Sequence, residues 1–537
     1  KMIELNIQHP AYIPSQEDIE EASREFSIDE ITRVIKNMQN ESTPGPSGTT
    51  KSFFLWLISM IPNLFAKGLN EYLNHHTESK SHEWIKKRKI VFIPKPGRPR
   101  NKIESYRPIS LLEVYYKVIA KLLANKLGKC VHKNISKSQF GFIPTRTVSE
   151  ASTYLQTVIN RARRTGEAIQ IVFLDARAAF DLTRTEATTA MMRHLGAPDE
   201  LVKKLNALTT KGVFCVEMYG ASSIETKILS GTGQGDPASS DKYDATHEGN
   251  TLLYKAKRFD WALRDGDELV DPVSFADDTS IPVQLRSLDD YKELLNFFDS
   301  LSAITGYAIN QAKTEILAFN TNPVLINEIN NLGKGAVKNR VKHLGIWLTS
   351  AEENMEKVNF DYLKGRMEKA TNRIVRRNQC SVYTRALLIE AILHSQTNHI
   401  IMSLNLTKEH LNEIQETIYK ALWKKKNNED AYIEGRHQIA KERTHAPIRV
   451  GGLNMRRTKI KAECLYFDSG IRHLRKFYDE EAPRMIERNI TKLLETDDQQ
   501  PDDLLTMGSR KIRDLSKKKT DLARIYTHTL AKLADTI

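Results

Sequence analysis

The chain has 537 residues, of which 40% are hydrophobic and 27% charged, and its formal net charge is +13 at pH 7. This length is too great for one compact domain, and the composition excludes an integral membrane protein and a wholly disordered chain. The excess of Lys and Arg suits a polyanionic partner such as a nucleic acid, although net charge says nothing about the fold. A basic protein with no nucleic-acid role stays open as an alternative at this point.

The cysteines and the apolar segments narrow the class of protein further. The four cysteines are Cys130, Cys215, Cys380 and Cys464. They are isolated, without C-x-x-C pairs or nearby His, so we expect no structural zinc and no disulfide framework, which fits a reducing intracellular compartment. The most apolar stretch, 53–66, is too short for a membrane span and predicts a core helix. The chain begins at Lys1 and shows no signal peptide, as expected of a fragment.

Helical and loop signals alternate through the first 130 residues. Ile28, Ile31, Val34 and Ile35 follow an amphipathic period, and Pro and Gly mark the loop that comes after them. In chain order the patterns predict a helix over 16–40, a rigid loop over 43–48, a helix over 52–74, a strand over 90–93, an apolar and basic patch over 106–112 and a helix over 115–127.

Strand signals concentrate in the middle of the chain. The clearest is the continuous apolar run 169–174, which ends abruptly at Asp175. The other expected strands are 213–219 and 224–229, forming a hairpin, 272–276, ending at Asp277 and Asp278, and its return partner 280–283. From about residue 355 onward the strand signals fade, and helical, basic segments dominate.

Carboxylates that directly follow strands are candidates for chemistry. Asp175 follows one apolar strand, and Asp277 and Asp278 follow another. If the two strands lie side by side, the three carboxylates meet, and their mutual repulsion then requires a cation. Hard oxygen ligands with open positions favour Mg²⁺, which keeps waters and accepts substrate phosphates. Alternatively, each of these residues is an ordinary polar turn residue.

A set of short motifs in a fixed order decides between these readings. Motif A of reverse transcriptases is resembled by Phe173-Leu-Asp175-Ala-Arg-Ala-Ala-Phe180-Asp181. Their motif C is resembled by Ser274-Phe-Ala-Asp277-Asp278, in the spelling typical of LINE-type (non-LTR) retrotransposons. Further blocks that resemble the same family are Tyr106–Leu112, Gln139–Phe142 with Arg146, Gly231–Pro237, Gly306–Glu315, His343–Ile346 and Gly451–Leu453. Each match is weak alone, but together they run in the family order from about residue 43 to 453.

The resemblance implies roles for the residues that match. Asp175 and Asp277 are expected to hold two Mg²⁺ ions and Asp278 to complete the carboxylate set, so that a 3′-hydroxyl is activated and pyrophosphate stabilised as it leaves. Lys313 is expected to protonate or neutralise the pyrophosphate. Phe180 is expected to lie beneath the incoming sugar and to exclude a 2′-hydroxyl.

Other matching residues are expected to hold the nucleotide. Two residues, Arg107 and Lys95, are candidates for binding the triphosphate. Arg98 and Lys102 compete with Lys95 for this role. Gln234 is expected to pack at the new base pair, where Gly235 lets the backbone approach closely. Asp181 lies at a helix start and is interpreted as a structural or N-capping group rather than a metal ligand.

The implied fold is α+β: a right-hand polymerase with fingers, a palm built on an antiparallel sheet and a helical thumb, followed by a basic helical region. The expected divisions are 1–90 for an N-terminal extension and the start of the fingers, 91–350 for fingers and palm, 351–430 for the thumb and 431–537 for the post-thumb region. Two departures from the family pattern stand out. Ser47 replaces the usual Asp, and 238–249 is unusually polar where the family is apolar, which predicts poor local packing.

The implied function is an RNA-directed DNA polymerase that copies retrotransposon RNA into cDNA by target-primed reverse transcription. Its expected partners are an RNA template, a DNA primer or target and dNTPs, with no membrane, in the nucleus and cytoplasm. An endonuclease is expected from a missing segment or a partner. A group II intron or retron reverse transcriptase, or a catalytically silent RNA-binding scaffold, stays open as an alternative.

Overall fold

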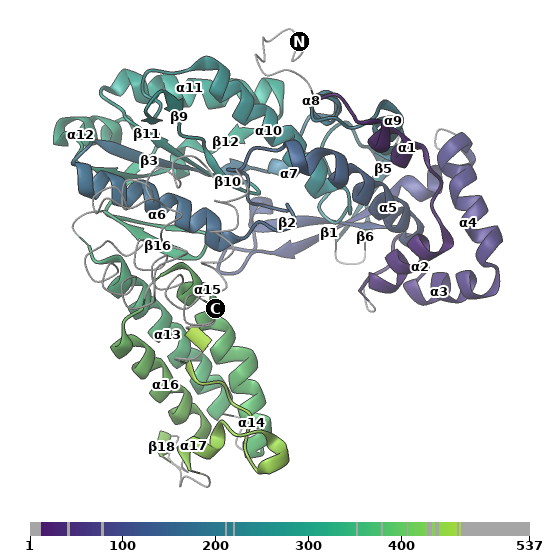
Figure 1. The fold of residues 1–537 in the computed structure, drawn as a ribbon. Coiled ribbons are helices and arrows are strands. Elements are labelled where there is room, and N and C mark those ends of the chain that lie inside the picture. The colour runs from purple at the N-terminus through teal and green to yellow at the C-terminus, as the bar shows by residue number, and fades with distance from the viewer. Residues whose placement is uncertain are drawn as a thin grey trace, which may run out of the picture.

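The computed structural model describes residues 12–39, 43–76, 80–209, 212–218, 221–350, 353–376, 380–404, 406–426, 432–434, 440–458, 461–462 and 465. Cys464 and most of the predicted region 431–537 lie outside these residues. Within them the chain forms two mixed layers of helix and sheet, from which a bundle of helices projects (Figure 1). The α+β class is therefore confirmed, whereas the division at residues 350 and 430 stays a prediction.

The central sheet has the strand order β10-β11-β3-β13-β14. Its members are β10 (Val273–Phe275), β11 (Asp278–Val283), β3 (Ile169–Leu174), β13 (Glu315–Phe319) and β14 (Ala336–Lys338). All neighbours are antiparallel except β13 and β14, which are parallel. The predicted strand at 169–174 is confirmed, and so is the return of 272–276 along 280–283.

β3 is buried on both faces, which explains why five of its six residues are apolar; the sixth, Gln170, is buried as well. Ile169, Ile171 and Phe173 pack into one hydrophobic cluster with α6 (Val148–Thr165), whereas Val172 and Leu174 pack into another with α11 (Leu288–Ile304). Alternate residues of a strand point to opposite faces, so a strand covered by helices on both sides has no solvent-facing positions.

A second sheet and six helices form the N-terminal part of the fold. Its strands are β1 (Lys87–Pro94), β2 (Tyr106–Leu112), β5 (Val213–Met218), β6 (Ala221–Ser222) and β7 (Thr226–Lys227). Its helices are α1 (Gln16–Ser23), α2 (Ile28–Asn37), α3 (Lys51–Met60), α4 (Pro62–Glu71), α5 (Val114–Val131) and α9 (Asp199–Thr209). The predicted hairpin is confirmed in part, because β7, which lies inside the expected strand 224–229, pairs antiparallel with β5. The return is shorter than predicted, since it is split between β6 and β7, and the side chains of Ile224 and Leu229 are exposed.

Two long helices predicted from the sequence are broken. The expected helix 16–40 is α1 and α2, because Ser27 caps a new helix in a reciprocal capping box with Glu30. The expected helix 52–74 ends at Met60, and Pro62 begins α4 at an angle of 113°. This bend leaves Phe53, Trp56, Met60 and Leu64 exposed, so the prediction of one core helix over 53–66 is wrong.

Helices dominate after residue 355, as predicted. The bundle consists of α13 (Met355–Val375), α14 (Val382–Leu388), α15 (Ser395–Ser403) and α16 (Lys408–Trp423), which share one apolar cluster with α6 and β3 (Figure 1). Among the described residues no single helix is long and apolar enough to cross a membrane, and only the bent pair α3 and α4 passes that test jointly.

The remaining short elements connect these layers. They are β4 (Ala176–Arg177), α7 (Ala179–Leu182), α8 (Thr185–His194), β8 (Arg264–Asp265), β9 (Glu268–Leu269), β12 (Ala308–Ile309), α12 (Pro323–Leu332), β15 (Arg340–His343), β16 (Ile346–Thr349), β17 (Lys424–Lys426), β18 (Tyr432–Glu434) and α17 (Lys441–Thr444). The helix α10 (Ser239–Lys257) lies between the two sheets and is buried along most of its length. The predicted poor packing of 238–249 is therefore wrong.

Candidate active site

Two carboxylates meet because neighbouring strands of the central sheet are in register. Leu174, the last residue of β3, pairs with Thr279 of β11. Asp175 follows Leu174, and Asp278 precedes Thr279, so the antiparallel pairing brings both residues to the same end of the sheet. This is the juxtaposition on which the sequence interpretation depends.

The third carboxylate lies in the hairpin turn beside them. Phe275 of β10 pairs with Asp278 of β11, which leaves Ala276 and Asp277 as the two turn residues. Ala276 has a φ of 56°, in the left-handed region that costs a residue with a side chain about 1–2 kcal/mol. The tight turn therefore holds Asp277 at the sheet edge at a cost in backbone strain.

The electrostatics of the three groups agree with this proximity. Burial raises the pKa of the Asp277 carboxyl, and the charge of Asp175 raises it further, while Arg107 opposes the shift. Burial, followed by repulsion from Asp277 and Asp175, raises the pKa of Asp278 to about 6. The three carboxylates are therefore close enough to repel one another as like charges. Arg107 faces the same site from β2.

Lys313 supplies a positive charge to this cluster. Its Nζ donates a hydrogen bond to Oδ2 of Asp175 at 2.9 Å, and both side chains are about half exposed. The backbone fixes the pair, because the amide of Asn310 donates to the carbonyl of Asp175 and the amide of Lys313 donates to the carbonyl of Asn310. The contact joins residues 138 positions apart in the sequence.

The donor set fits a divalent cation. It consists of carboxylate oxygens, the ligands that Mg²⁺ prefers, and their mutual repulsion is what a bound cation relieves. Among the residues that the structure describes, no three His, Cys, Asp or Glu side chains are arranged to hold a metal ion by themselves.

Phe180 lies next to the carboxylates in an aromatic group. It belongs to α7, which begins after Ala178 in a left-handed conformation. Its ring stacks on Tyr243 of α10 with centroids 4.7 Å apart, and Phe142 meets it edge-on at 6.0 Å. Phe180 is therefore backed by a buried ring and has little freedom to move away from a ligand.

Of the two roles expected for Asp181, structural or N-capping, the structure excludes the second. The N-cap of α7 is Ala178, without a side-chain hydrogen bond, and the helix starts at Ala179, so Asp181 lies past the capping position. Burial raises the pKa of its carboxyl. The interpretation of Asp181 as an N-cap is therefore wrong.

Comparison with known proteins identifies this arrangement. Residues 93–348 match the family model described as reverse transcriptase (RNA-dependent DNA polymerase). This chain contains a reverse transcriptase domain. The match includes both strands that carry the carboxylates, the hairpin turn and Lys313, and members of this family generally use a divalent metal.

The curated relatives are proteins of mobile elements. The chain is 24% identical to a 149 kDa protein of transposon TX1 from Xenopus laevis over 80% of its own length and 31% of the relative. It is 26% identical to the RNA-directed DNA polymerase from mobile element jockey of Drosophila melanogaster over 55% of its length and 32% of the relative. The resemblance to non-LTR retrotransposon reverse transcriptases is thus confirmed, and the chain spans about a third of the length of these relatives.

Among solved structures the chain is similar to apo telomerase from Candida tropicalis. The TM-score is 0.35 at 12% identity, over 56% of this chain and 59% of that one. From here on the central sheet is called the palm, the sheet of β1, β2 and β5 the fingers, and the bundle α13–α16 the thumb.

The glycine-rich loop of the reverse transcriptase domain joins the fingers to the site. The amide of Ser110 in β2 donates to the carbonyl of Gln234 at 2.8 Å. Gly235 has a φ of 112°, and a Cβ there would lie 2.7 Å from the carbonyl oxygen of Ser110. Only glycine therefore fits at 235, as the motif predicts, whereas a contact of Gln234 with a base pair stays a prediction.

The two candidates for the triphosphate differ in their surroundings. Arg107 is exposed on β2 and acts on the pKa of Asp277, so it lies within electrostatic reach of the carboxylates. Lys95 lies just beyond β1, and its Nζ donates to the carbonyl of Glu104 at 2.9 Å. The structure thus brings Arg107 toward the site and ties Lys95 to its own hairpin.

Three residues that sequence reasoning missed shape the site from behind. Tyr243 supports Phe180, and His247 Nε2 is 3.1 Å from the hydroxyl of Thr279, directly after Asp278. Gly141 packs so closely on the hairpin turn that a Cβ there would lie 2.1 Å from the backbone nitrogen of Ala276. The glycine within the Gln139–Phe142 block was the available signal, but nothing in the sequence showed what it faces.

Proposed function

We propose that this chain is an active RNA-directed DNA polymerase of a non-LTR retrotransposon, which copies the element's RNA into cDNA by target-primed reverse transcription. The observation that carries the proposal is the meeting of Asp175, Asp277 and Asp278 at one sheet edge within a reverse transcriptase domain. Its substrates are an RNA template, a DNA primer or nicked target and dNTPs.

Asp175, Asp277 and Asp278 hold two Mg²⁺ ions in this proposal. Bound there, the ions supply Lewis acidity to the attacking 3′-hydroxyl and to the leaving pyrophosphate. Asp278, whose pKa is raised to about 6, is ionised at neutral pH and available as a ligand. Arg107 binds the triphosphate through its planar guanidinium, which can grip phosphate oxygens with two parallel donors.

Lys313 is proposed to act on the leaving group. Its ion pair with Asp175 holds the ammonium close to the carboxylates. As pyrophosphate forms, the ammonium can neutralise it or transfer a proton to it, which is general-acid work. The position of the pair at the sheet edge supports this role.

Phe180 is proposed to select deoxynucleotides. A ring held between Tyr243 and Phe142 cannot retreat from a 2′-hydroxyl, so a ribose would clash while a deoxyribose fits. Gln234 and Gly235 would then line the new base pair. We further propose that the nuclease for target cleavage comes from another segment or a partner, and that the protein works in the nucleus and cytoplasm.

Primer extension on an RNA template with Mg²⁺ and dNTPs tests the proposal, with the parent protein beside Asp277→Asn. The isosteric amide removes one ligand charge, so extension should fall by at least about a hundredfold. Asp289→Asn is the matched control, because Asp289 is an exposed carboxylate on α11. Absence of extension by the parent would support a silent scaffold, and equal extension by the Asp277→Asn variant would reject the site assignment.

A further inference from the structure

One buried histidine lies behind the carboxylate hairpin and has no role in the proposed function. His247 belongs to α10 and is 4% exposed, and its Nε2 is 3.1 Å from the hydroxyl of Thr279. Its Nδ1 has no hydrogen-bond partner within the described part of the chain, so the contact with Thr279 is the directional contact of this ring. His247 falls in the polar stretch 238–249, where the reverse transcriptase family is apolar, so the family resemblance assigns nothing to it.

Thr279 is the residue through which this ring reaches the carboxylates. It directly follows Asp278 in β11, and it pairs with Leu174, the residue before Asp175. Across the hairpin it pairs with Ser274, and the two hydroxyl oxygens lie 3.4 Å apart. A displacement of Thr279 would therefore move Asp278 directly and would disturb the strand pairing that aligns Asp278 with Asp175.

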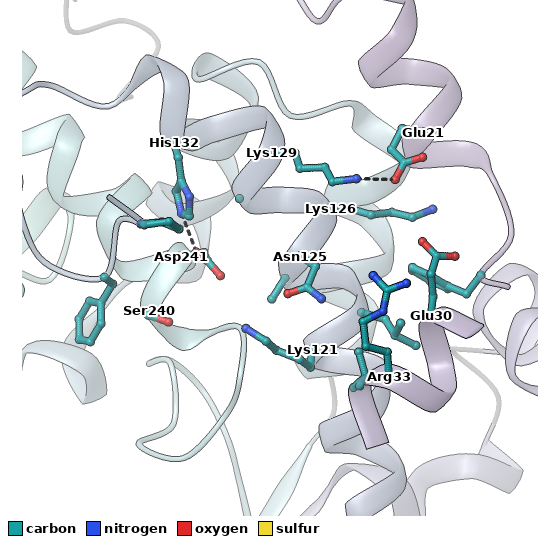
Figure 2. A pocket seen from close by; sticks show the side chains of 17 residues that line it. Glu21, Glu30, Arg33, Lys121, Asn125, Lys126, Lys129, His132, Ser240 and Asp241 are labelled. Atoms are coloured by element: carbon teal, nitrogen blue, oxygen red, sulfur yellow. Dashed lines mark hydrogen bonds and ion pairs between the residues drawn. The ribbon is translucent and has the colours of Figure 1, made fainter. Parts of the chain in front are cut away.

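The helix that presents His247 is itself held on both sides of this residue. Figure 2 shows the contact of Asp241, six residues earlier (247 − 241), with His132, where Oδ1 and Nε2 are 2.7 Å apart. Directly after His247, the carboxylate of Glu248 accepts a hydrogen bond from the backbone amide of Ser136 at 3.1 Å. Buried hydrogen bonds are stronger than those in water and weaken steeply when their geometry changes. The imidazole of His247 therefore projects from a fixed backbone.

Aromatic contacts restrict the imidazole from its other sides. Tyr243 lies one helical turn earlier, with its ring centroid 5.8 Å from that of His247, and the same tyrosine stacks on Phe180 at 4.7 Å. Tyr307 meets the imidazole edge-on at 5.3 Å. A contiguous row of rings thus runs from Phe180 through Tyr243 and His247 to Tyr307. Within this row, His247 is the ring that also bonds to the carboxylate hairpin.

The imidazole carries no charge in this position. Burial lowers the pKa of His247 to about 4, so the ring is neutral at pH 7. A neutral imidazole has one N–H donor and one acceptor nitrogen, and so it can bond to a hydroxyl without adding a charge beside the carboxylates. A leucine would occupy a similar volume but would leave Thr279 without this bond. What histidine adds at position 247 is therefore a directional contact, which suits positioning rather than acid–base chemistry.

We propose that His247 is a positioning residue for nucleotide incorporation: through the hydroxyl of Thr279 it fixes the strand end that carries Asp278. The inference rests on the proposed polymerase function. Side chains that orient a metal-binding group from behind typically contribute about 10- to 100-fold to metal affinity or activity. The loss of one hydrogen bond corresponds to roughly tenfold, so we expect an effect at the lower end of that range.

Single-turnover incorporation of one dNTP on an RNA template, with the protein in excess over primer–template, measures this effect. His247→Leu should lower the rate constant about tenfold, while the dNTP concentration at half-maximal rate changes by less than about twofold. His247→Gln keeps a donor near the position of Nε2 and should restore the rate constant to within about threefold of the parent. The preference for deoxynucleotides should stay unchanged in both variants, because Phe180 still rests on Tyr243.

A double-mutant cycle tests whether the bond itself is what acts. Thr279→Val removes the hydroxyl with little change of shape, and the double variant His247→Leu/Thr279→Val should be no slower than the slower single variant. The unfolding free energies of the same four proteins in denaturant give a second reading that needs no substrate or metal, and the two substitutions should be coupled there as well. His445→Leu is the matched control. It removes a histidine–hydroxyl contact of 2.6 Å with Tyr419 of the thumb, and it should leave the rate constant unchanged.

Several results would contradict this role of His247. A folded His247→Leu protein with the rate constant of the parent, or losses that simply add in the cycle, would overturn the inference. A changed sugar preference at an unchanged rate would overturn it too, because His247 would then act on Phe180 alone. If His247→Leu does not fold, Thr279→Val decides in its place: a rate about tenfold lower supports the role, and the parental rate overturns it. A parent protein that incorporates nothing refutes the polymerase itself and this inference with it, whereas an active parent beside an unaffected variant overturns the inference alone.

Discussion

Gly141→Ala is the sharpest steric test of how the active site is held. A Cβ at position 141 would lie 2.1 Å from the backbone nitrogen of Ala276, where ordinary contacts begin near 3.4 Å. The two segments must therefore separate by about 1.3 Å, the difference between those distances. They cannot do so freely, because the amide of Phe140 donates to the carbonyl of Ser274 and the amide of Ser274 to that of Ser138.

The displaced residue directly precedes Asp277, so the strain acts on the carboxylates. A misplacement of about 1 Å at a reacting centre can cost roughly a hundredfold in rate, and we expect kcat to fall by that factor while the KM for primer–template changes little. Single-turnover incorporation of one dNTP on an RNA template measures the loss, with circular dichroism to show that the variant folds.

The control for this substitution is Gly365→Ala in α13. A Cβ there meets no other atom within 4 Å, and Ala is favoured over Gly in a helix by about 1 kcal/mol, so activity should be retained and stability should rise slightly. A folded Gly141→Ala protein that incorporates dNTPs within about threefold of the parent would show that the close packing at Ala276 is irrelevant to catalysis.

Three other predictions follow from the same geometry. Phe180→Val should raise incorporation of ribonucleotides relative to deoxynucleotides, measured as the ratio of kcat/KM for the two; an unchanged ratio would make Phe180 purely structural. Because the pKa of Asp278 is raised to about 6, Mg²⁺ binding near pH 6 should release protons and tighten as pH rises, and calorimetry in buffers of different ionisation enthalpy should show this release disappear in Asp278→Asn. Burial raises the pKa of Glu248 to about 7, so folding favours the protonated acid, and the unfolding free energy should fall by about 3 kcal/mol between pH 4.5 and 7. Glu248→Gln should remove most of that fall in denaturant titrations, whereas an unaltered pH dependence would show that Glu248 does not titrate there.

The sequence predicted best what depends on local pattern. The six residues of β3 are all apolar or buried, and the carboxylate that ends the run lies where a strand end must place it. The order of the motifs then placed Asp277 and Asp278 at the end of another strand. Strand pairing in a covered sheet leaves little choice of register, because a shift by one residue would reverse every buried face.

The predictions failed where tertiary contacts override local pattern. The apolar period of 16–40 continues across Ser27, yet the capping box there starts a new helix, and a weak periodic signal does not show such a break. The sequence does not show what Gly141 and Tyr243 contact, because the first faces a turn 135 residues away (276 − 141) and the second supports a ring of another helix. Their importance lies in what they touch.

The polar helix α10 is the clearest case of a tertiary contact that local pattern does not show. Its polar side chains form buried hydrogen bonds to other elements instead of facing solvent. Asp241 bonds to His132, Glu248 to the backbone amide and hydroxyl of Ser136, and His247 to the hydroxyl of Thr279. These partners belong to the segment after α5 and to β11, so one helix is fixed by directional bonds to both sides of the site. Apolar contacts would allow α10 to slide at small cost, whereas buried hydrogen bonds lose their geometry within fractions of an ångström. The polar sequence thus holds Tyr243 under Phe180 and His247 beside the hairpin of Asp277 and Asp278 in one fixed relation.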